Sequence, residues 1–444
     1  MSEWIDSSLG ELCDQRKGIT YKSKDYCEEG TGFPFLTIKT FEKGGGFDPS
    51  GVKYYNGSFL PQDILKQDDV LIAVTDLTRA GDIVGSPLLV PGFGTADFAL
   101  ASMDCMKLTP IAQKCDKKFL YYSLMDNAIR RQMVANSRGS TVLHLDTKCI
   151  PDMKIKVPVQ KKIQKKIAEL LSTIDAQIEQ TEALIAKQEN IRRGLMQDLF
   201  TRGVDATGQL RPAYQDAPHL YHETELGWLP KGWKVKRISQ LLELKSNAMR
   251  SGPFGSSLLK NELVVTGIPF LGIDNIFTEF FKPEFSRYVT ERKFLELSRY
   301  QVFPDDVIIS IMGTVGRCCV VPNIKSKMLS SKHLWTMSFN QNQILSNLVC
   351  WQLNYAPWIL AWFRRETQGG IMDAIQSSTL KNTKLVVPDE ASQTVLNKIY
   401  IDERKRISSL KDQLAKSNLI KAGLMRDLLS GDVSVAPLMQ ETSA

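Results

Sequence analysis

The sequence predicts an α+β protein built as a tandem repeat, in which two β-rich domains alternate with two long helices. Three observations predict this fold. Motifs recur in the same order in both halves, short β-branched runs lie between turn signals in each half, and a heptad pattern closes each half. With 444 residues, 43% of them hydrophobic, the chain has enough apolar side chains for more than one core.

The clearest repeat is a hexapeptide: Gly194–Leu199 (GLMQDL) recurs as Gly423–Leu428 (GLMRDL), 229 residues later. Other pairs follow in the same order: Trp4 with Trp233, Pro34–Ile38 with Pro269–Ile273, Asp68–Ile72 with Asp305–Ile309, and Val157–Pro158 with Val387–Pro388. The offset between matching residues is nearly constant at the ends of the two halves, whereas it varies in their middles. This pattern indicates a duplicated scaffold that carries divergent inserts.

The repeat divides the chain into six segments. We expect a first β-rich domain at 1–158, a helix at 159–200, a linker at 201–232, a second β-rich domain at 233–388, a helix at 389–430 and a tail at 431–444. Proline just before each helix fits a helix start, and the linker contains several Gly and Pro without apolar periodicity.

Short apolar runs predict strands in the β-rich domains. Val70–Val74 and Val307–Ile311 are examples, and the turn at Gly313–Arg317 predicts a hairpin between Val307–Ile311 and Cys318–Val321. We expect some helix as well, for example at 117–135.

Each long helix carries a narrow apolar stripe with steps of four and three residues, which is typical of helices that pair. The apolar positions of the first stripe are Ile167, Leu171, Ile174, Ile178, Ile185, Leu195 and Leu199. Those of the second are Leu396, Tyr400, Ile407, Leu410, Leu414, Leu424 and Leu428. Both stripes turn polar at the same place, at Gln188 and Arg192 and at Ser417 and Lys421. The residues alone leave open whether the helices pair antiparallel or parallel.

Composition and motifs argue against several classes of protein. There is no apolar run long enough to span a membrane, and the N-terminal residues do not resemble a secretory signal. Eight cysteines without a C-x-x-C pair predict free thiols in a reducing cytoplasm. The net charge of +7 permits a nucleic-acid partner, and no P-loop or G-x-G-x-x-G motif is present.

Two short patterns leave a metal site open as an alternative. Pro388–Asp389 followed by Glu403–Lys405 loosely resembles a metal-dependent nuclease motif, although Glu403 falls on the heptad stripe. His219 and His222 have a spacing that could bind a metal, but no Cys or carboxylate pattern surrounds them. Because the residues around each pattern do not support a site, we expect no catalytic residue and no bound metal in this chain.

Basic, amide and hydroxyl side chains cluster in probable loops of both halves, where they could contact DNA bases and phosphates. The candidates of the first half are Lys39, Thr40, Thr75, Arg79, Arg138, Ser140 and Thr141. Those of the second half are Asn275, Thr314, Lys332, Gln368, Ser377, Ser378 and Thr379.

These motifs together resemble the DNA-specificity subunits of type I restriction-modification systems. The resemblance covers nearly the whole chain. It rests on the GLMxDL end of each helix, on Glu225–Trp233 (ELGWLPKGW) and on Phe303–Gly316 (FPDDVIISIMGTVG). The first half departs from it, because Asp76–Gly81 replaces the compact Met-Gly-Thr-Val-Gly turn.

The resemblance implies that each β-rich region is a target recognition domain, which reads one half of a bipartite double-stranded DNA site. It also implies that the helices pair as an antiparallel coiled coil, set the gap between the half-sites and dock two methyltransferase subunits. Those subunits would bring S-adenosylmethionine, and two restriction-translocase subunits would use ATP and Mg. This chain would be a non-catalytic cytoplasmic protein of a bacterium or archaeon without a cofactor of its own.

Two other classes of function stay open at this point. One is a coiled-coil adaptor protein that has no DNA sequence preference. The other is a metal-dependent nuclease that uses Asp389 and Glu403.

Overall fold

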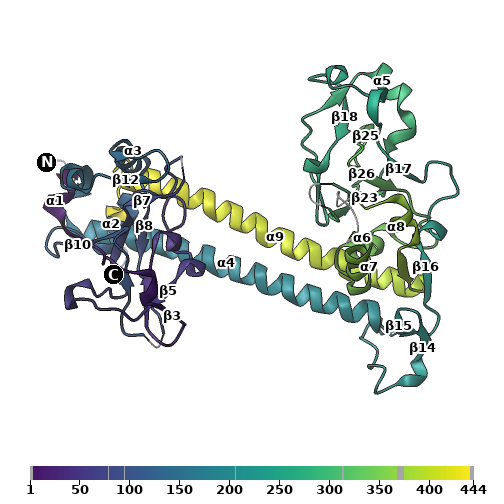
Figure 1. Ribbon diagram of the computed structural model, residues 1–444, viewed down its shortest axis with the longest axis horizontal. Coiled ribbons are helices and arrows are strands. Elements are labelled where there is room, and N and C mark those ends of the chain that lie inside the picture. The colour runs from purple at the N-terminus through teal and green to yellow at the C-terminus, as the bar shows by residue number, and fades with distance from the viewer. Residues whose placement is uncertain are drawn as a thin grey trace. The chain divides into compact units, whose positions relative to one another are not determined.

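The computed structural model describes residues 4–440, except 79, 95, 206, 313–314 and 368–374. The chain forms two compact units, one of residues 1–183 and 412–444 and the other of residues 184–411. Each unit combines a β-rich domain with parts of two long helices, α4 (Lys161–Thr201) and α9 (Glu390–Leu429). The predicted α+β fold with alternating β-rich domains and long helices is confirmed (Figure 1).

In the first unit, the first and last strands of the β-rich domain pair with each other. Strand β1 (Trp4–Ser8) pairs antiparallel with β13 (Lys154–Pro158), directly before α4. One four-stranded sheet has the order β2 (Cys13–Lys17), β10 (Cys105–Pro110), β6 (Val70–Ala73) and β8 (Pro87–Leu89). Another has the order β3 (Tyr26–Cys27), β5 (Lys53–Tyr55), β4 (Phe33–Leu36) and β9 (Leu100–Ala101).

The helix expected at 117–135 is two helices, α2 (Lys117–Leu124) and α3 (Asn127–Ala135). The side chain of Asp126 accepts a hydrogen bond from the amide of Ala128 at 2.7 Å, so it caps α3. An N-cap aspartate satisfies a free amide at the start of a helix, which allows the chain to turn between α2 and α3.

The second unit repeats this plan. Strand β16 (Lys234–Arg237) pairs antiparallel with β27 (Lys384–Val387), directly before α9. One sheet has the order β17 (Met249–Ser251), β26 (Leu334–Met337), β23 (Val307–Ser310) and β24 (Cys318–Val320). Another has the order β21 (Tyr288–Val289), β18 (Ile268–Leu271), β25 (Met328–Ser330) and β22 (Gln301–Val302). The short helices are α5 (Glu291–Glu296), α6 (Ser346–Tyr355), α7 (Pro357–Thr367) and α8 (Ser377–Asn382). The predicted hairpin across Gly313–Arg317 is confirmed, because β23 and β24 pair antiparallel.

The central strand of each unit is buried throughout and almost entirely apolar because both of its faces are covered. In β6, Ile72 belongs to one buried cluster and Leu71 to another. In β23, Ile309 belongs to one buried cluster and Ile308 to another. Alternate residues of a strand point to opposite faces, so a sheet buried on both sides needs a continuous hydrophobic run.

Helices α4 and α9 run antiparallel in each unit. In the first unit, Ile167 and Leu171 near the start of α4 share a buried cluster with Leu428 near the end of α9. In the second unit, Leu199 near the end of α4 shares a cluster with Leu396 near the start of α9. Figure 1 shows the two helices side by side.

The heptad stripe faces inward along its whole length: every apolar stripe residue predicted from the sequence is buried or half-buried. The polar stripe positions also find partners inside their own units. Lys421 forms a 2.6 Å ion pair with Asp175 in the first unit, and Gln188 donates to Glu403 at 2.6 Å in the second.

One buried glutamine at the start of each long helix joins that helix to its β-rich domain. The amide group of Gln164 donates to the carbonyl oxygens of Lys114 (3.0 Å) and Pro158 (2.9 Å), and its oxygen accepts from the amide of Asp116 (2.8 Å). Gln393 makes the corresponding bonds in the second unit. Its partners are Gln343 at 2.8 Å, Pro388 at 3.0 Å and the amide of Leu345 at 3.0 Å.

The segment expected to be a linker at 201–232 carries structure of its own in the second unit. It contains an antiparallel hairpin of β14 (Tyr221–Thr224) and β15 (Gly227–Pro230), and Val204 and Leu229 lie in the core of that unit. Its apolar residues are spaced irregularly because they cover the end of a core rather than one face of a helix or sheet.

Candidate nucleic-acid interface

The nuclease pattern does not form a site. Asp389 lies at the N-terminus of α9, where its carboxylate accepts from the amide of Ser392 at 2.9 Å and from the indole of Trp233 at 3.2 Å. Glu403 lies fourteen residues along the chain, about 20 Å away at the usual helical rise. The two carboxylates are therefore too far apart to share a metal ion.

The described part of the chain contains no cluster of three or more His, Cys, Asp or Glu side chains placed to hold a metal ion. This part includes His219 and His222, so these two histidines have no third metal ligand beside them. Within the same residues, no helix is both long enough and apolar enough to cross a membrane.

In the first unit, a three-stranded sheet brings two of the predicted loops together. Its order is β11 (Ser137–Arg138), β12 (Leu143–Leu145) and β7 (Thr75–Asp76). The turn between β11 and β12 exposes Arg138, Ser140 and Thr141 next to the loop that follows β7. Segments more than sixty residues apart in sequence thus present basic and hydroxyl groups on one edge.

A buried carboxylate organises the loop that follows β7. Asp76 is fully buried and accepts hydrogen bonds from the amides of Thr78 (2.6 Å), Ile83 (2.5 Å) and Val84 (2.9 Å). Burial raises the pKa of Asp76, but the amide donors lower it by more than burial raises it, so the pKa lies below its ordinary value. These bonds to a charged carboxylate fix the backbone of the loop at Thr78, Ile83 and Val84.

Two adjacent arginines of α3 lie beside this loop, in a surface hollow of about 700 Å³ that is also lined by Ala80 and Asn127. The guanidinium of Arg130 donates to the carbonyl oxygen of Asp82 at 2.9 Å and to the hydroxyl of Ser86, so it braces the loop. Arg131 is exposed and makes one bond to the carbonyl of Asn127 at 3.2 Å, which leaves most of its donors facing solvent.

In the second unit, Lys332 lies near the end of β23. The carbonyl oxygen of the next residue, His333, accepts from the amide of Ile311 at 3.0 Å, and Lys332 itself is exposed. The indole of Trp335 donates to the carbonyl oxygen of Ile375 at 3.1 Å, which brings the start of α8 to this region. On α8, Ser378 is exposed and Ser377 is half-buried.

Four predicted contact residues require correction because their side chains are buried. The hydroxyl of Thr40 donates to the carbonyl of Thr37 at 2.7 Å, and the side chain of Asn275 donates to the carbonyls of Lys282 and Glu284. The other two are Thr75 and Thr379, which are 5% and 8% exposed. We assign all four to the framework of the loops and not to contact with DNA.

The remaining candidates fall into two groups. Lys39 is exposed on the surface of the first unit, in a turn whose cap is Thr37. The others lie outside the described residues: Arg79, Thr314 and Gln368.

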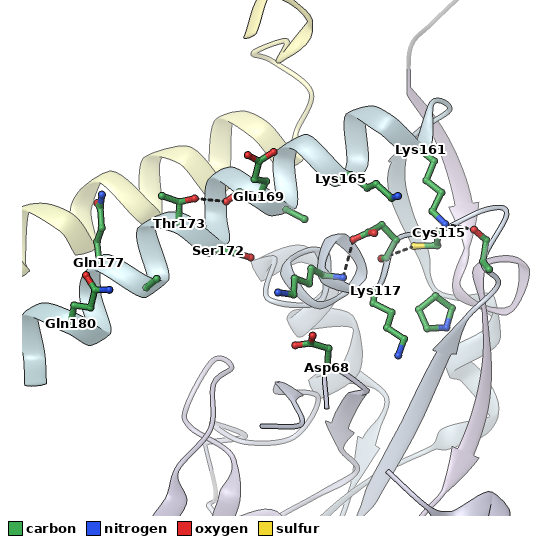
Figure 2. Close-up of a pocket in the computed structure, with 16 residues that line it drawn as sticks. Asp68, Cys115, Lys117, Lys161, Lys165, Glu169, Ser172, Thr173, Gln177 and Gln180 are labelled. Carbon is green, nitrogen blue, oxygen red and sulfur yellow. Dashed lines mark hydrogen bonds between the residues drawn. The ribbon is translucent and has the colours of Figure 1, made fainter. Parts of the chain in front are cut away.

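A larger groove of about 870 Å³ lies between α4 and the start of α2 in the first unit. In Figure 2, Lys165, Ser172 and Gln177 follow α4 along one wall, and Lys117 and Asp68 lie opposite. Small residues of α4 at intervals of four line the groove: Ala168, Ser172 and Ala176. No pattern in the sequence predicts this groove, because it depends on how α2 meets α4.

The two buried glutamines were not predicted from the sequence either. A signal was present, since Gln164 and Gln393 occupy equivalent positions of the repeat just after the helix start. The same uncharged polar residue at the same place in both halves indicates a repeated buried hydrogen bond.

Comparisons with known proteins agree with this architecture. The family model of the type I restriction modification DNA specificity domain matches residues 1–190. The specificity subunit of the type I restriction enzyme EcoBI from Escherichia coli is 21% identical over 99% of this chain and 92% of its own length. The putative MjaX specificity subunit from Methanocaldococcus jannaschii is 24% identical over 98% of this chain and 94% of its own length.

Solved structures show the same fold. The S subunit of the type I restriction-modification system from M. genitalium superimposes with a TM-score of 0.59 at 15% identity, with 96% of each chain covered. A chain from a study of complex assembly and conformational transition of the type I R-M system has a TM-score of 0.53 at 16% identity, over 97% of this chain and 98% of its own. Residues 1–190 thus match the type I restriction modification DNA specificity domain, and nearly the whole chain is similar in sequence to type I specificity subunits.

Proposed function

We propose that this chain is the sequence-specific DNA-binding component of a type I restriction-modification complex, without catalytic activity or a cofactor of its own. Each β-rich domain is a target recognition domain that reads one half of a bipartite site. The observation that carries this proposal is the contrast within the repeat. The glutamine anchors and the closing strand pairs are the same in both units, whereas the exposed loops differ in length and residues.

In the first recognition domain, we assign DNA contact to Arg131, Arg138, Ser140 and Thr141. Arginine can donate two hydrogen bonds to guanine in the major groove, and hydroxyl groups can bind phosphates or bases. The hydrogen bonds that Asp76 accepts from the amides of Thr78, Ile83 and Val84 favour this role, because backbone that is already fixed loses little entropy on binding. In the second domain we assign it to Lys332, Ser377 and Ser378, and Lys39 is a further phosphate contact of the first.

The paired helices set the gap between the half-sites and dock the partner subunits. We expect two methyltransferase subunits, which bring S-adenosylmethionine, and two restriction-translocase subunits, which use ATP and Mg. The groove along α4 supports docking, because small side chains at Ala168, Ser172 and Ala176 allow another helix to approach closely. Lysines at its edge add affinity for an acidic segment of that helix.

The proposal is tested by methylome sequencing of cells that express this chain with its methyltransferase subunits. We expect one bipartite motif with a fixed gap. Replacing residues 1–158 with the first domain of another family member should change one half of the motif and leave the other half and the gap unchanged. A continuous motif, or methylation or cleavage by the purified chain alone, would contradict the proposal.

A further inference from the structure

A short hairpin of the second unit brings an acidic residue against both long helices. The hairpin consists of β19 (Ile276–Phe277) and β20 (Phe280–Phe281), and Glu279 lies in its turn. The backbone of Glu279 has a φ of 59°, which is uncommon for a residue other than glycine. Its amide donates to the carbonyl oxygen of Cys318 in β24 at 2.8 Å, so the hairpin is fixed to the central sheet of the domain.

Glu279 contacts three helices. Its carboxylate forms a 2.5 Å ion pair with Arg192 of α4 and accepts from the hydroxyl of Tyr355 in α6 at 3.0 Å. Its carbonyl oxygen accepts from Arg404 of α9 at 2.5 Å. The Glu279 and Arg192 side chains are only 7% and 11% exposed, so water cannot easily replace either partner. One residue of the recognition domain therefore joins the domain to α4 and α9 at once.

The equivalent helix positions of the first unit are paired in a different way. The positions equivalent to Arg192 and Arg404 are Lys421 and Asp175 in the first unit. These two carry opposite charges and pair with each other at 2.6 Å, and the hydroxyl of Tyr122 in the first recognition domain donates to Asp175 at 2.7 Å.

Two arginines on facing helices cannot form such a pair, because their charges are alike. The second helix pair therefore depends on the recognition domain for an acceptor, and Glu279 supplies both a carboxylate and a carbonyl oxygen. Moving the hairpin away would leave Arg192 half-buried without its counterion. This cost holds the second domain in one orientation on its own helices.

We propose that Glu279 is a positioning residue that fixes the second recognition domain on its helices and thereby narrows the range of gaps that the protein accepts. The proposal rests on the function proposed above, since it concerns the bipartite site. It assigns no base contact to Glu279. Replacing this residue should therefore change the tolerated gap and leave the bases of both half-sites unchanged.

The test uses the full chain in complex with its methyltransferase subunits and a library of targets whose gaps differ by one base pair. Wild type should prefer one gap. In Glu279→Ala, the preference for that gap over its neighbours should fall roughly fivefold or more, the usual lower range of coupling between linked sites. Glu279→Gln keeps one side-chain oxygen and the main-chain carbonyl as acceptors but removes the charge, so its loss of preference should be smaller.

Two further variants keep the test decisive. Arg192→Lys retains the charge but loses the planar guanidinium geometry, so it should also broaden the gap preference. This variant replaces Glu279→Ala in the test if Glu279→Ala does not fold. Lys411→Met removes an ion pair between α9 and Glu189 of α4 that does not involve the recognition domain, so the gap preference should stay unchanged.

The outcomes separate this proposal from the proposed function. A lower melting temperature for Glu279→Ala and Arg192→Lys with an unchanged gap profile would mean that the contact serves stability alone, and would overturn the positioning role. A wild-type complex that methylates no bipartite motif would overturn the proposed function itself.

Discussion

Gln393 makes in the second unit the three main-chain hydrogen bonds that Gln164 makes in the first. Each glutamine lies one helical turn after the start of its long helix and is almost completely buried. The partners are equivalent positions of the two domains. The repeat therefore preserves the way in which each domain joins its helix, although the loops of the domains have diverged.

Gln164→Leu and Gln393→Leu should each destabilise the protein by about 1–3 kcal/mol, because each leaves one amide and two carbonyl groups without a partner in a buried place. Urea denaturation of the purified chain measures this change. Gln413→Leu, at an exposed position of α9, is the matched control and should stay within about 0.5 kcal/mol of wild type. Equal stability of all three variants would contradict the anchoring role.

Arg138→Ala should weaken recognition of the first half-site only. If the guanidinium contacts a base, discrimination at one position should fall by about 1–3 kcal/mol, whereas loss of a phosphate contact should weaken binding to all sequences and reduce its salt dependence. Competition binding with half-site variants at two salt concentrations distinguishes these cases. Arg292→Ala, which alters an arginine of α5 that is 91% exposed, should leave the first half-site unaffected.

Asp76→Asn should loosen the loop after β7 and destabilise the first unit by about 1.5–3 kcal/mol at neutral pH, the usual range for hydrogen bonds to a charged group. The pKa of Asp76 is lower in the folded protein than in the unfolded chain, so its stabilisation is present above the unfolded pKa. It is lost as the pH falls through the folded pKa. The stability difference between wild type and variant should therefore be constant from pH 8 to about pH 5 and shrink in more acidic solution. A difference that grows on acidification would refute this account.

Removing one heptad from each of α4 and α9 should shorten the preferred gap. Seven residues correspond to about 10 Å of helix, or roughly three base pairs of duplex. Methylome sequencing of the double deletion gives the new gap directly. The bases of both half-sites should stay the same, and an unaltered gap would exclude the helices as the spacer.

Ala176→Trp should block the groove on α4 and reduce assembly with the methyltransferase subunits, because the indole would occupy the space beside the small residues. Size-exclusion chromatography of the mixed subunits measures assembly. Lys53→Trp adds the same ring at an exposed position of β5 outside the groove and should assemble normally. Normal assembly of Ala176→Trp would place the docking surface elsewhere.

Much of the fold could be predicted because it depends on local periodicity. The heptad stripe identified Ile167 and Leu428 as inward-facing, and the β-branched run at Val307–Ile311 identified a buried strand. The direction of the helix pair could not be predicted from the residues, because a stripe has the same period in either direction. The break between α2 and α3 was missed, since Asp126 acts as a cap only when the chain turns there.

The candidate site was predicted less well. Recurrence in both halves suggested that Thr40 and Asn275 contact DNA, but both are buried at equivalent places in the duplicated framework. Recurrence marks the shared scaffold, whereas contact with different sequences requires residues that differ. The ion pair between Glu279 and Arg192 joins residues that are far apart in the chain, so no local pattern could reveal it.

The glutamine anchors have a consequence for how such proteins change. On the domain side, all of their partners are main-chain groups, which every amino acid supplies in the same form. Substitutions around this joint therefore leave it intact as long as the path of the chain is kept. A new target preference can arise by mutation or by exchange of a whole domain. The helix end that carries the glutamine does not have to change with it.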